Sequence, residues 1–413
     1  MSLKRKKIAA VLLVTSLIFV SVVSCVKPYR PSIVTSTSNY LVVEGLINIS
    51  DSTYIKLSRT VAVYAATATK PELKATVTIE SNSGNSYPVK EIGNGLYAAP
   101  SYALSVTNQY RLRIKTSNGN TYTSDFADTK ASPPIDSISW KIDNNQLKIF
   151  ANTHDPNNST HYYRWSFTEE WIFHTDFNSN IITDGLNVRY RTPAESVYQC
   201  FAGDVSTSIG LGTSTKLSQD VINNALITTM ASTDQKIGIR YSIELTQYAL
   251  TKDAFDYWTL LKKNTEDLGS IFDSQPSASI GNIHNINNAA EPVIGYINAG
   301  SVSKQRIFID KTQLPRSWTT PLYPSLAFCG PDSLNCCPPP NSAPGYMPPT
   351  TNQYVNYKNL STYIGGATPL TPIAVVLVSP PNVLTNNTPI IAAPPTCVDC
   401  TVTGTKTQPA YWH

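Results

Sequence analysis

The sequence predicts a mainly β protein with two consecutive immunoglobulin-like β-sandwich domains, one inserted amphipathic helix and a Pro/Cys-rich C-terminal extension. Its 23 tyrosines, together with many threonines and valines, favour the half-buried surface of a pleated sheet. The 29 prolines and a charged fraction of only 15% suit strands joined by turns. Short runs of alternating apolar and polar residues recur between turn signals. The 413 residues also exceed the size of one ordinary core.

The N-terminus has the layout of a lipoprotein signal peptide over residues 1–24. Four basic residues, Lys4 to Lys7, precede an apolar stretch from Ile8 to Val23, and small Ser24 precedes Cys25. This pattern predicts cleavage before Cys25 and attachment of diacylglycerol to its sulfur. The alternatives are an ordinary secretory signal or a short membrane anchor with a coincidental cysteine. The apolar run is shorter than the ~20 residues that a membrane span needs.

Removal of the signal peptide would leave a formally neutral chain. Of the 32 Lys and Arg residues, four lie in the signal, which has no acidic residue, so 28 basic residues would face 28 acidic ones. The mature sequence has no basic block, so we expect no nucleic-acid partner. Residues 25–37 are predicted to form a lipidated, proline-bearing tether. Val26 is not the aspartate of an inner-membrane retention signal, which predicts an outer-membrane location through the lipid anchor.

Residues 38–130 are predicted to form the N-terminal immunoglobulin-like sandwich. Alternating runs that predict strands are Leu41–Ile47, Tyr54–Leu57, Ala75–Glu80 and Tyr110–Ile114. Turn signals separate them at residues 82–85, 93–95 and 118–120. Their spacing is typical of a sandwich.

Residues 131–318 are predicted to form the second β-sandwich, because Ala131–Pro134 interrupts the pattern and new strand-like runs follow. These runs include Ile135–Trp140, Gln146–Phe150, His161–Phe167 and Lys236–Leu245. The pattern is weak between residues 176 and 226, which we interpret as an irregular insertion.

One segment of the second domain, residues 251–267, predicts a helix. Ala254, Tyr257, Trp258 and Leu261 fall on one face of that helix, and Thr251 can cap its first turn. The apolar face is expected to pack on the second sandwich. An exposed face that binds a partner is the alternative.

Residues 319–413 form the proline-rich C-terminal extension and contain five of the six cysteines that follow Cys25. An even number of cysteines in an exported chain favours disulfides, with the connectivity open. If all six pair, Cys200 must bridge to the extension. Cys397-x-x-Cys400 has two alternatives, a redox pair and a zinc site shared with Cys336 and Cys337. We predict neither metal nor cofactor. The candidate disulfide cysteines are Cys200, Cys329, Cys336, Cys337, Cys397 and Cys400.

No catalytic signature stands out in the sequence. It has no H-E-x-x-H, G-x-S-x-G or phosphate-loop motif. Glu169, Glu170 and Asp176 suggest an alternative function, a cell-envelope glycan hydrolase whose site is assembled from distant carboxylates. Adjacent residues of a strand point to opposite faces, which argues against a Glu169–Glu170 pair. We therefore expect a non-enzymatic protein.

Several segments, spread in order over nearly the whole mature chain, resemble the Domain of Unknown Function 4249 family of Bacteroidota outer-membrane lipoproteins. They are Leu41–Gly45, Lys56–Thr60, Tyr110–Ile114, Tyr162–Trp165, Gln247–Thr251, Tyr257–Trp258, Lys262–Glu266, Gly269–Asp273, Gln275–Ser277, Gly281–Ile283, Glu291–Tyr296, Cys397–Thr401 and Trp412.

This resemblance implies an exported lipoprotein without established activity, often encoded beside TonB-dependent transporters. We therefore expect a binding or accessory module, with a TonB-dependent β-barrel transporter as candidate partner. The basic, proline-rich stretch Val26–Pro31 leaves both the cell-surface and the periplasmic face open. Ser52, Ser137 and Ser333 each follow an aspartate in tripeptides that resemble the O-glycosylation motif of that phylum.

Overall fold

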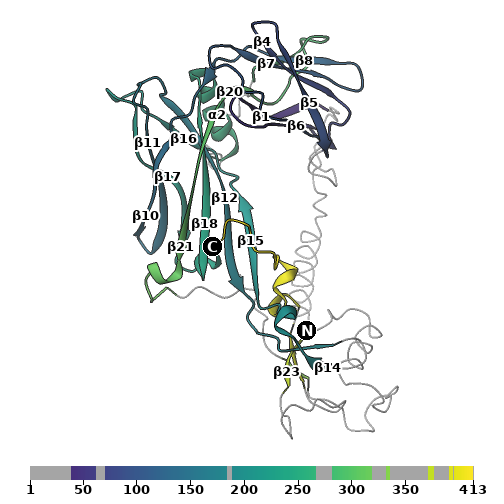
Figure 1. Cartoon of the computed structure of the whole chain (residues 1–413), viewed down its shortest axis with the longest axis vertical. Coiled ribbons are helices and arrows are strands. Elements are labelled where there is room, and N and C mark those ends of the chain that lie inside the picture. Colours follow the sequence, from purple (N-terminus) through teal and green to yellow (C-terminus); the bar gives the residue numbers. More distant parts are fainter. Residues whose placement is uncertain are drawn as a thin grey trace, which may run out of the picture. The chain divides into compact units, whose positions relative to one another are not determined.

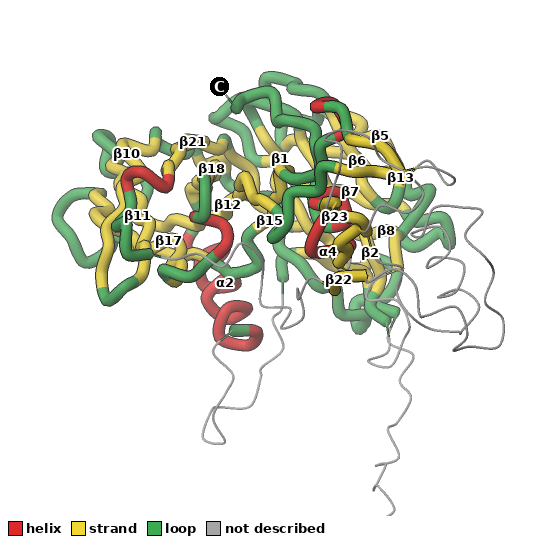
Figure 2. The backbone as a smooth tube through the Cα atoms, turned by 90° about the horizontal axis from the view of Figure 1, so that it is seen from below, coloured by secondary structure: helices red, strands yellow, loops and turns green. Residues whose placement is uncertain are grey.

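A computed structural model describes residues 39–61, 70–183, 188–266, 281–318, 332–334, 371–375, 390–393 and 395–412. Strands account for most of this regular structure, as Figures 1 and 2 show. The two sandwiches belong to the compact unit that comprises residues 40–59 and the chain from residue 71 onward. The predicted fold class, mainly β with two sandwich domains, is confirmed.

The first sandwich is one long sheet that doubles over a single core. Strand β5 pairs with β4 in one half of the sheet and with β6 in the other. Alternating residues such as Leu41, Val43, Ile79 and Leu112 point into the core and are almost fully buried. The strands are β1 (Leu41–Asn48), β2 (Thr53–Arg59), β3 (Lys70–Pro71), β4 (Thr76–Ser81), β5 (Ser86–Gly93), β6 (Leu96–Ala99), β7 (Tyr110–Lys115), β8 (Thr121–Ser124), β9 (Thr129–Lys130), β19 (Ile283–Asn285) and β20 (Asn298–Gly300).

Two of these strands come from within residues 131–318, the range predicted for the second domain, and this corrects that boundary. Strand β19 pairs with β8, and β20 lies between β1 and β9, parallel to both. Ile283, Ile297 and Ala299 complete the first core. The returning segment passes close to β1 at Gly295. Glycine is required there because its φ is +133° and because a β-carbon would collide with the Val43 carbonyl.

The second sandwich packs a three-stranded sheet against a larger one. Leu147, Tyr241 and Ile243 share one core cluster, and Ala151, Trp165 and Leu245 share another. The first sheet contains β10 (Ile135–Asp143), β11 (Gln146–His154) and β17 (Val221–Ala231). The second contains β15 (Gln199–Val205), β12 (Tyr162–His174), β18 (Arg240–Ala249) and β21 (Val302–Asp310), with β16 (Gly210–Thr213) paired to β12.

The region between residues 176 and 226 is more regular than its sequence predicts. It supplies β15 and β16 and the start of β17, as well as a hairpin of β13 (Ile181–Thr183) and β14 (Val188–Tyr190). The prediction of an irregular insertion is therefore wrong. Strand β17 is half-exposed and bulged, so its alternation of apolar and polar residues is weak. Short 3₁₀ turns occur at Pro193–Glu195, Gln235–Ile237 and Lys311–Gln313.

The predicted helix is present as α2 (Lys252–Thr265), and residue 267 lies outside the described residues. The Thr251 hydroxyl accepts a hydrogen bond from Ala254 N, as expected of an N-cap. Ala254 and Tyr257 are buried, whereas Trp258 is only partly buried. Within the described residues, no helix has the length and apolarity to span a membrane.

The described part of the C-terminal extension holds a small antiparallel sheet followed by single helical turns. The central strand of this sheet, β24, pairs with both of the other strands. The elements are β22 (Asp332–Leu334), β23 (Thr371–Val375), β24 (Ile390–Ala393), α4 (Pro395–Val398) and a 3₁₀ turn at Cys400–Val402.

Candidate functional site

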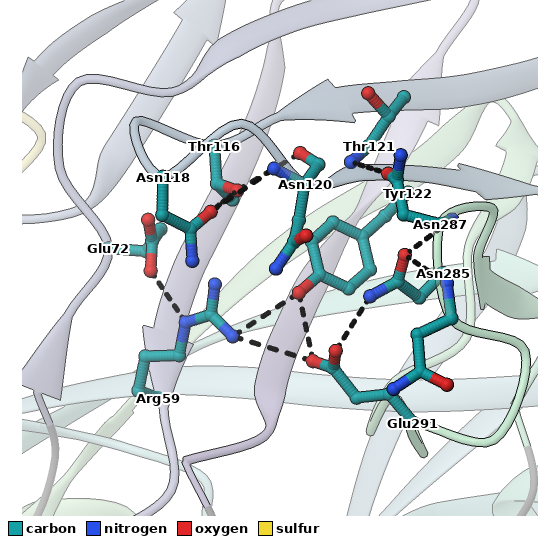
Figure 3. Close-up of polar contacts among 11 residues, drawn as sticks. Arg59, Glu72, Thr116, Asn118, Asn120, Thr121, Tyr122, Asn285, Asn287 and Glu291 are labelled. Carbon is teal, nitrogen blue, oxygen red and sulfur yellow. Dashed lines mark hydrogen bonds and ion pairs between the residues drawn. The ribbon is translucent and has the colours of Figure 1, made fainter.

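A polar network lies in the first sandwich, where β2 and β8 meet the segment that returns after α2 (Figure 3). Its centre is the buried Arg59 at the end of β2. Arg59 Nε donates to Glu72 Oε2 at 2.6 Å, and Arg59 Nη1 lies 3.7 Å from Glu291 Oε1. Tyr122 donates its hydroxyl to Glu291 Oε1 at 2.8 Å, and Asn285 Nδ2 donates to Glu291 Oε2 at 2.6 Å.

Burial sets the electrostatics of this network. Burial raises the pKa of Tyr122, and the hydrogen bond to Glu291 adds to this, so its hydroxyl remains a donor at neutral pH. Burial alone would lower the pKa of Arg59, but hydrogen bonds with Glu72 and Tyr122 outweigh it and leave that pKa raised. Arg59 is therefore a fixed cation between two carboxylates.

Two exposed segments lie at this edge of the sandwich, and hydrogen bonds connect the one around Asn287 to the network. Asn287 Oδ1 accepts from Thr121 N at 2.7 Å, and Asn287 N donates to Asn285 Oδ1 at 2.8 Å. In the neighbouring β7–β8 turn, Asn118 Oδ1 accepts from Asn120 N at 3.2 Å. Asn118 and Asn287 are exposed. The arrangement thus presents amide groups on firmly held loops, a geometry suited to binding.

The carboxylates proposed for hydrolysis do not form a catalytic pair. Glu169 is buried, where Tyr241 donates to it at 2.6 Å and Lys236 forms an ion pair with it. Glu170 accepts from Trp412 Nε1 at 3.3 Å on the opposite face of β12. Asp176 follows β12, and burial raises its pKa.

The predicted cross-link between the second sandwich and the extension is present as a disulfide between Cys200 and Cys400. Both cysteines are fully buried. Cys397 is also disulfide-bonded. Because Cys400 is bonded to Cys200, the Cys397-x-x-Cys400 pair is neither a redox disulfide nor part of a zinc site. Cys25, Cys329, Cys336 and Cys337 lie outside the described residues.

Residues 400–412, which we call the C-terminal clasp, cover part of the second sandwich. The Trp412 ring lies edge-on to Phe201 and Phe308, with ring centroids 5.4 Å apart in each case. The Arg306 guanidinium lies 3.6 Å from the centre of the Tyr411 ring. A backbone bridge between Phe201 and Thr405 extends the contact. Sequence reasoning predicted the cross-link to the extension but did not find these contacts.

Two of the predicted glycosylation serines are described with their side chains. Ser52 is partly buried in the β1–β2 turn, and its backbone N donates to Asp51. Ser137 is exposed on β10, and its hydroxyl accepts from Asn152. Ser333 lies in β22. Their modification stays a prediction. Among the residues with described positions, no group of His, Cys, Asp or Glu side chains could hold a metal ion.

Asp155 forms a separate polar site in the turn after β11. Its carboxylate accepts hydrogen bonds from the backbone N atoms of Asn157, Ser159 and Thr160 at 2.9–3.0 Å. Burial alone would raise the pKa of Asp155, but hydrogen bonds from the Ser159 hydroxyl and these three backbone groups lower it to about 2. Its charged form therefore stabilises the fold.

We expect Asp155→Asn to lower the free energy of unfolding at pH 7 by about 2 kcal/mol, because the folded-state pKa is depressed. The wild-type contribution is fully present above the ordinary pKa of 3.8 and is lost as the pH falls through about 2. Urea unfolding between pH 7 and pH 2 measures this effect. Asp128→Asn, at an exposed position, should change stability by less than about half a kcal/mol. Equal losses in both variants would contradict the prediction.

These features define the class of protein: a mainly β chain of two β-sandwiches with a disulfide-linked C-terminal clasp. The chain belongs to the family described as "Domain of unknown function (DUF4249)", whose model matches residues 26–306. The family resemblance found in the sequence is thereby confirmed.

The chain is also similar to solved β structures. A two-domain fibronectin type III segment from chicken tenascin is 13% identical, with 50% of this chain and 90% of that chain covered and a TM-score of 0.15. The calcium-binding domain CBD12 of CALX1.1 is 8% identical, with 64% and 98% covered and a TM-score of 0.12. Comparison with curated proteins gives no match.

Proposed function

We propose that the protein is a non-enzymatic lipoprotein of the outer membrane, anchored through acylated Cys25, that acts as a binding or accessory module for a TonB-dependent β-barrel transporter. The observation that carries the proposal is the basic and apolar N-terminus that ends in Val22-Val23-Ser24-Cys25. Several acyl chains on one cysteine hold a protein on a bilayer without a spanning helix.

The arrangement of the described side chains supports a binding role over hydrolysis. The Arg59 network fixes the exposed loop around Asn287 at the edge of the first sandwich, and such loops are common sites of recognition. Glu169 and Glu170, in contrast, are engaged by Tyr241 and Trp412 on opposite faces of a strand. This arrangement favours a module that presents a surface to a partner.

The anchor is tested with Cys25→Ser. We expect full-length protein to move from the outer-membrane fraction to the soluble fraction, or to remain as an uncleaved precursor, because the acylated sulfur is lost. Ser24→Ala keeps a small residue before the cysteine and should leave the protein membrane-bound. Immunoblots of fractionated cells measure the distribution. Firm membrane binding of correctly cleaved Cys25→Ser would exclude the lipid anchor.

The partner is tested by purification of the acylated protein from native membranes. Recovery of a TonB-dependent β-barrel in stoichiometric amount supports the accessory role. Repeated isolation of a monomer that cleaves envelope glycans would favour the hydrolase instead. Lack of that activity in a Glu169→Gln variant that keeps its fold would assign the cleavage to Glu169.

A further inference from the structure

Three arginines share one face of the larger sheet in the second sandwich, and aromatic rings lie against each. In the register, Arg164 pairs with Tyr248, Arg306 with Glu244, and Arg240 with Asp310. Residues 240, 244 and 248 alternate along β18 with the core residues Tyr241, Ile243 and Leu245. All three arginines therefore lie on the face turned away from the core.

The aromatic contacts of the three guanidinium groups are alike. The Arg164 carbon Cζ lies 4.0 Å from the centre of the Tyr248 ring and 4.4 Å from that of Trp258 on α2. Arg240 lies 4.7 Å from Phe308, and Arg306 lies 3.6 Å from Tyr411. Such stacking fixes the plane of a guanidinium and with it the direction of its N–H groups.

The three arginines differ in their acidic partners. Arg240 Nε lies 3.3 Å from Asp310, and Arg306 Nη2 lies 3.1 Å from Glu244. Arg164 has no ion pair with any carboxylate among the described residues. Two acidic side chains on and just after α2 are engaged elsewhere: Glu266 binds Lys262 and Ile209 N, and Asp256 binds Lys252.

Two buried donors remain without an acceptor at this position. Arg164 Nε and Trp258 Nε1 are both buried, and neither has a hydrogen-bond partner within the described part of the chain. They belong to side chains that contact each other. Leaving a buried donor unsatisfied costs folding free energy, and more for a charged group. Burial also lowers the pKa of Arg164, although a guanidinium stays protonated at neutral pH.

We propose that Arg164, held between Tyr248 and Trp258, binds a small oxyanion, either a carboxylate or a phosphate group. Both present paired oxygens to the fork of guanidinium N–H groups. Either would supply the negative charge that Asp310 and Glu244 supply to the other two arginines. The Trp258 indole N–H is the second donor of the site. The inference goes beyond the proposed function and does not depend on the lipid anchor.

The test uses the purified full chain with sodium acetate and sodium phosphate as probes, at constant ionic strength set with chloride. Calorimetric titration measures binding, and the thermal midpoint measures the stabilisation that binding gives. We expect saturable binding to the wild type. Arg164→Lys keeps the charge but loses the fork, so we expect about tenfold weaker binding, or about 1.4 kcal/mol. Trp258→Phe keeps a ring but loses the indole N–H, and should weaken binding several-fold.

The matched control is Arg306→Lys, which alters a stacked arginine that already has Glu244. Binding by this variant should equal that of the wild type. Tighter binding of acetate identifies a carboxylate ligand, and tighter binding of phosphate identifies a phosphate ligand. Absence of saturable binding to the wild type, or equal affinity of the wild type and both site variants, would overturn the proposal. If Arg164→Lys does not fold, Trp258→Phe alone decides between these outcomes.

Discussion

Cys200→Ser is expected to lower the free energy of unfolding by roughly 2–5 kcal/mol. The disulfide joins positions 200 residues apart, so it restricts the unfolded chain over a very long loop. It also fixes the start of the C-terminal clasp on β15, because Cys200 lies in that strand. Urea unfolding of the oxidised wild type and of the variant measures the difference. Cys400→Ser should have the same effect, since both variants break one bond.

Loss of this bond should also release the clasp. Trp412 and Tyr411 would then be held by noncovalent contacts alone, so we expect limited proteolysis to cut within residues 401–412 faster in the variant. Trp412→Ala is the control, because it removes the ring contacts and keeps the disulfide. It should speed cleavage less than Cys200→Ser does. Unchanged stability and unchanged cleavage in both cysteine variants would mean that the bond adds little to the fold.

Arg59→Met is expected to cost about 3–5 kcal/mol of folding stability. The substitution keeps an apolar stem but leaves the carboxylates of Glu72 and Glu291 without their shared cation. An uncompensated buried charge is far more costly than a lost surface pair. Chemical denaturation at pH 7 measures this loss. If circular dichroism shows that Arg59→Met is folded at low temperature, thermal melting of the variant and the wild type measures the same difference in stability.

Two further variants separate charge from packing at Arg59. Arg113→Met removes an exposed arginine 3.9 Å from Glu80 and should change stability by less than about half a kcal/mol. Arg59→Met combined with Glu72→Gln should recover part of the loss, because one unpaired charge is then removed. A double variant no more stable than Arg59→Met would assign the cost to packing around the arginine.

Alternation and capping patterns in the sequence predicted the strands and the helix in which these patterns are clear. The alternation in Tyr110–Ile114 corresponds to β7, and Thr251 caps α2 as its sequence indicates. Strands β19 and β20 were missed because three residues are too few to show a period of two. Their positions depend on pairing with strands far away in the sequence, which no local pattern encodes.

The candidate sites were less predictable than the fold. Cysteine counting indicated that Cys200 bridges to the extension, but only the folded chain identifies Cys400 as the partner. Arg59 and Glu291 both lie in segments that carried the family resemblance, and this was the one available signal for their network. The sequence gives no signal that Arg164 lacks a carboxylate partner among the described residues. That property depends on which side chains of β12, β18 and α2 lie next to each other.

The position of β20 between β1 and β9 has a consequence for the order of assembly. Leu46 of β1 pairs with Asn298 of β20. More than half of the chain is therefore synthesised between these two neighbouring strands. Strands β10 to β18 of the second sandwich are inserted between β9 and β19 of the first, and a fragment that stops at residue 130 lacks β20, the strand that lies between β1 and β9. Strand β21 of the second sandwich follows β20 in the sequence, so both sandwiches obtain their last strands only after residue 298 has been synthesised, and residues 40–130 alone lack two strands of the first sheet.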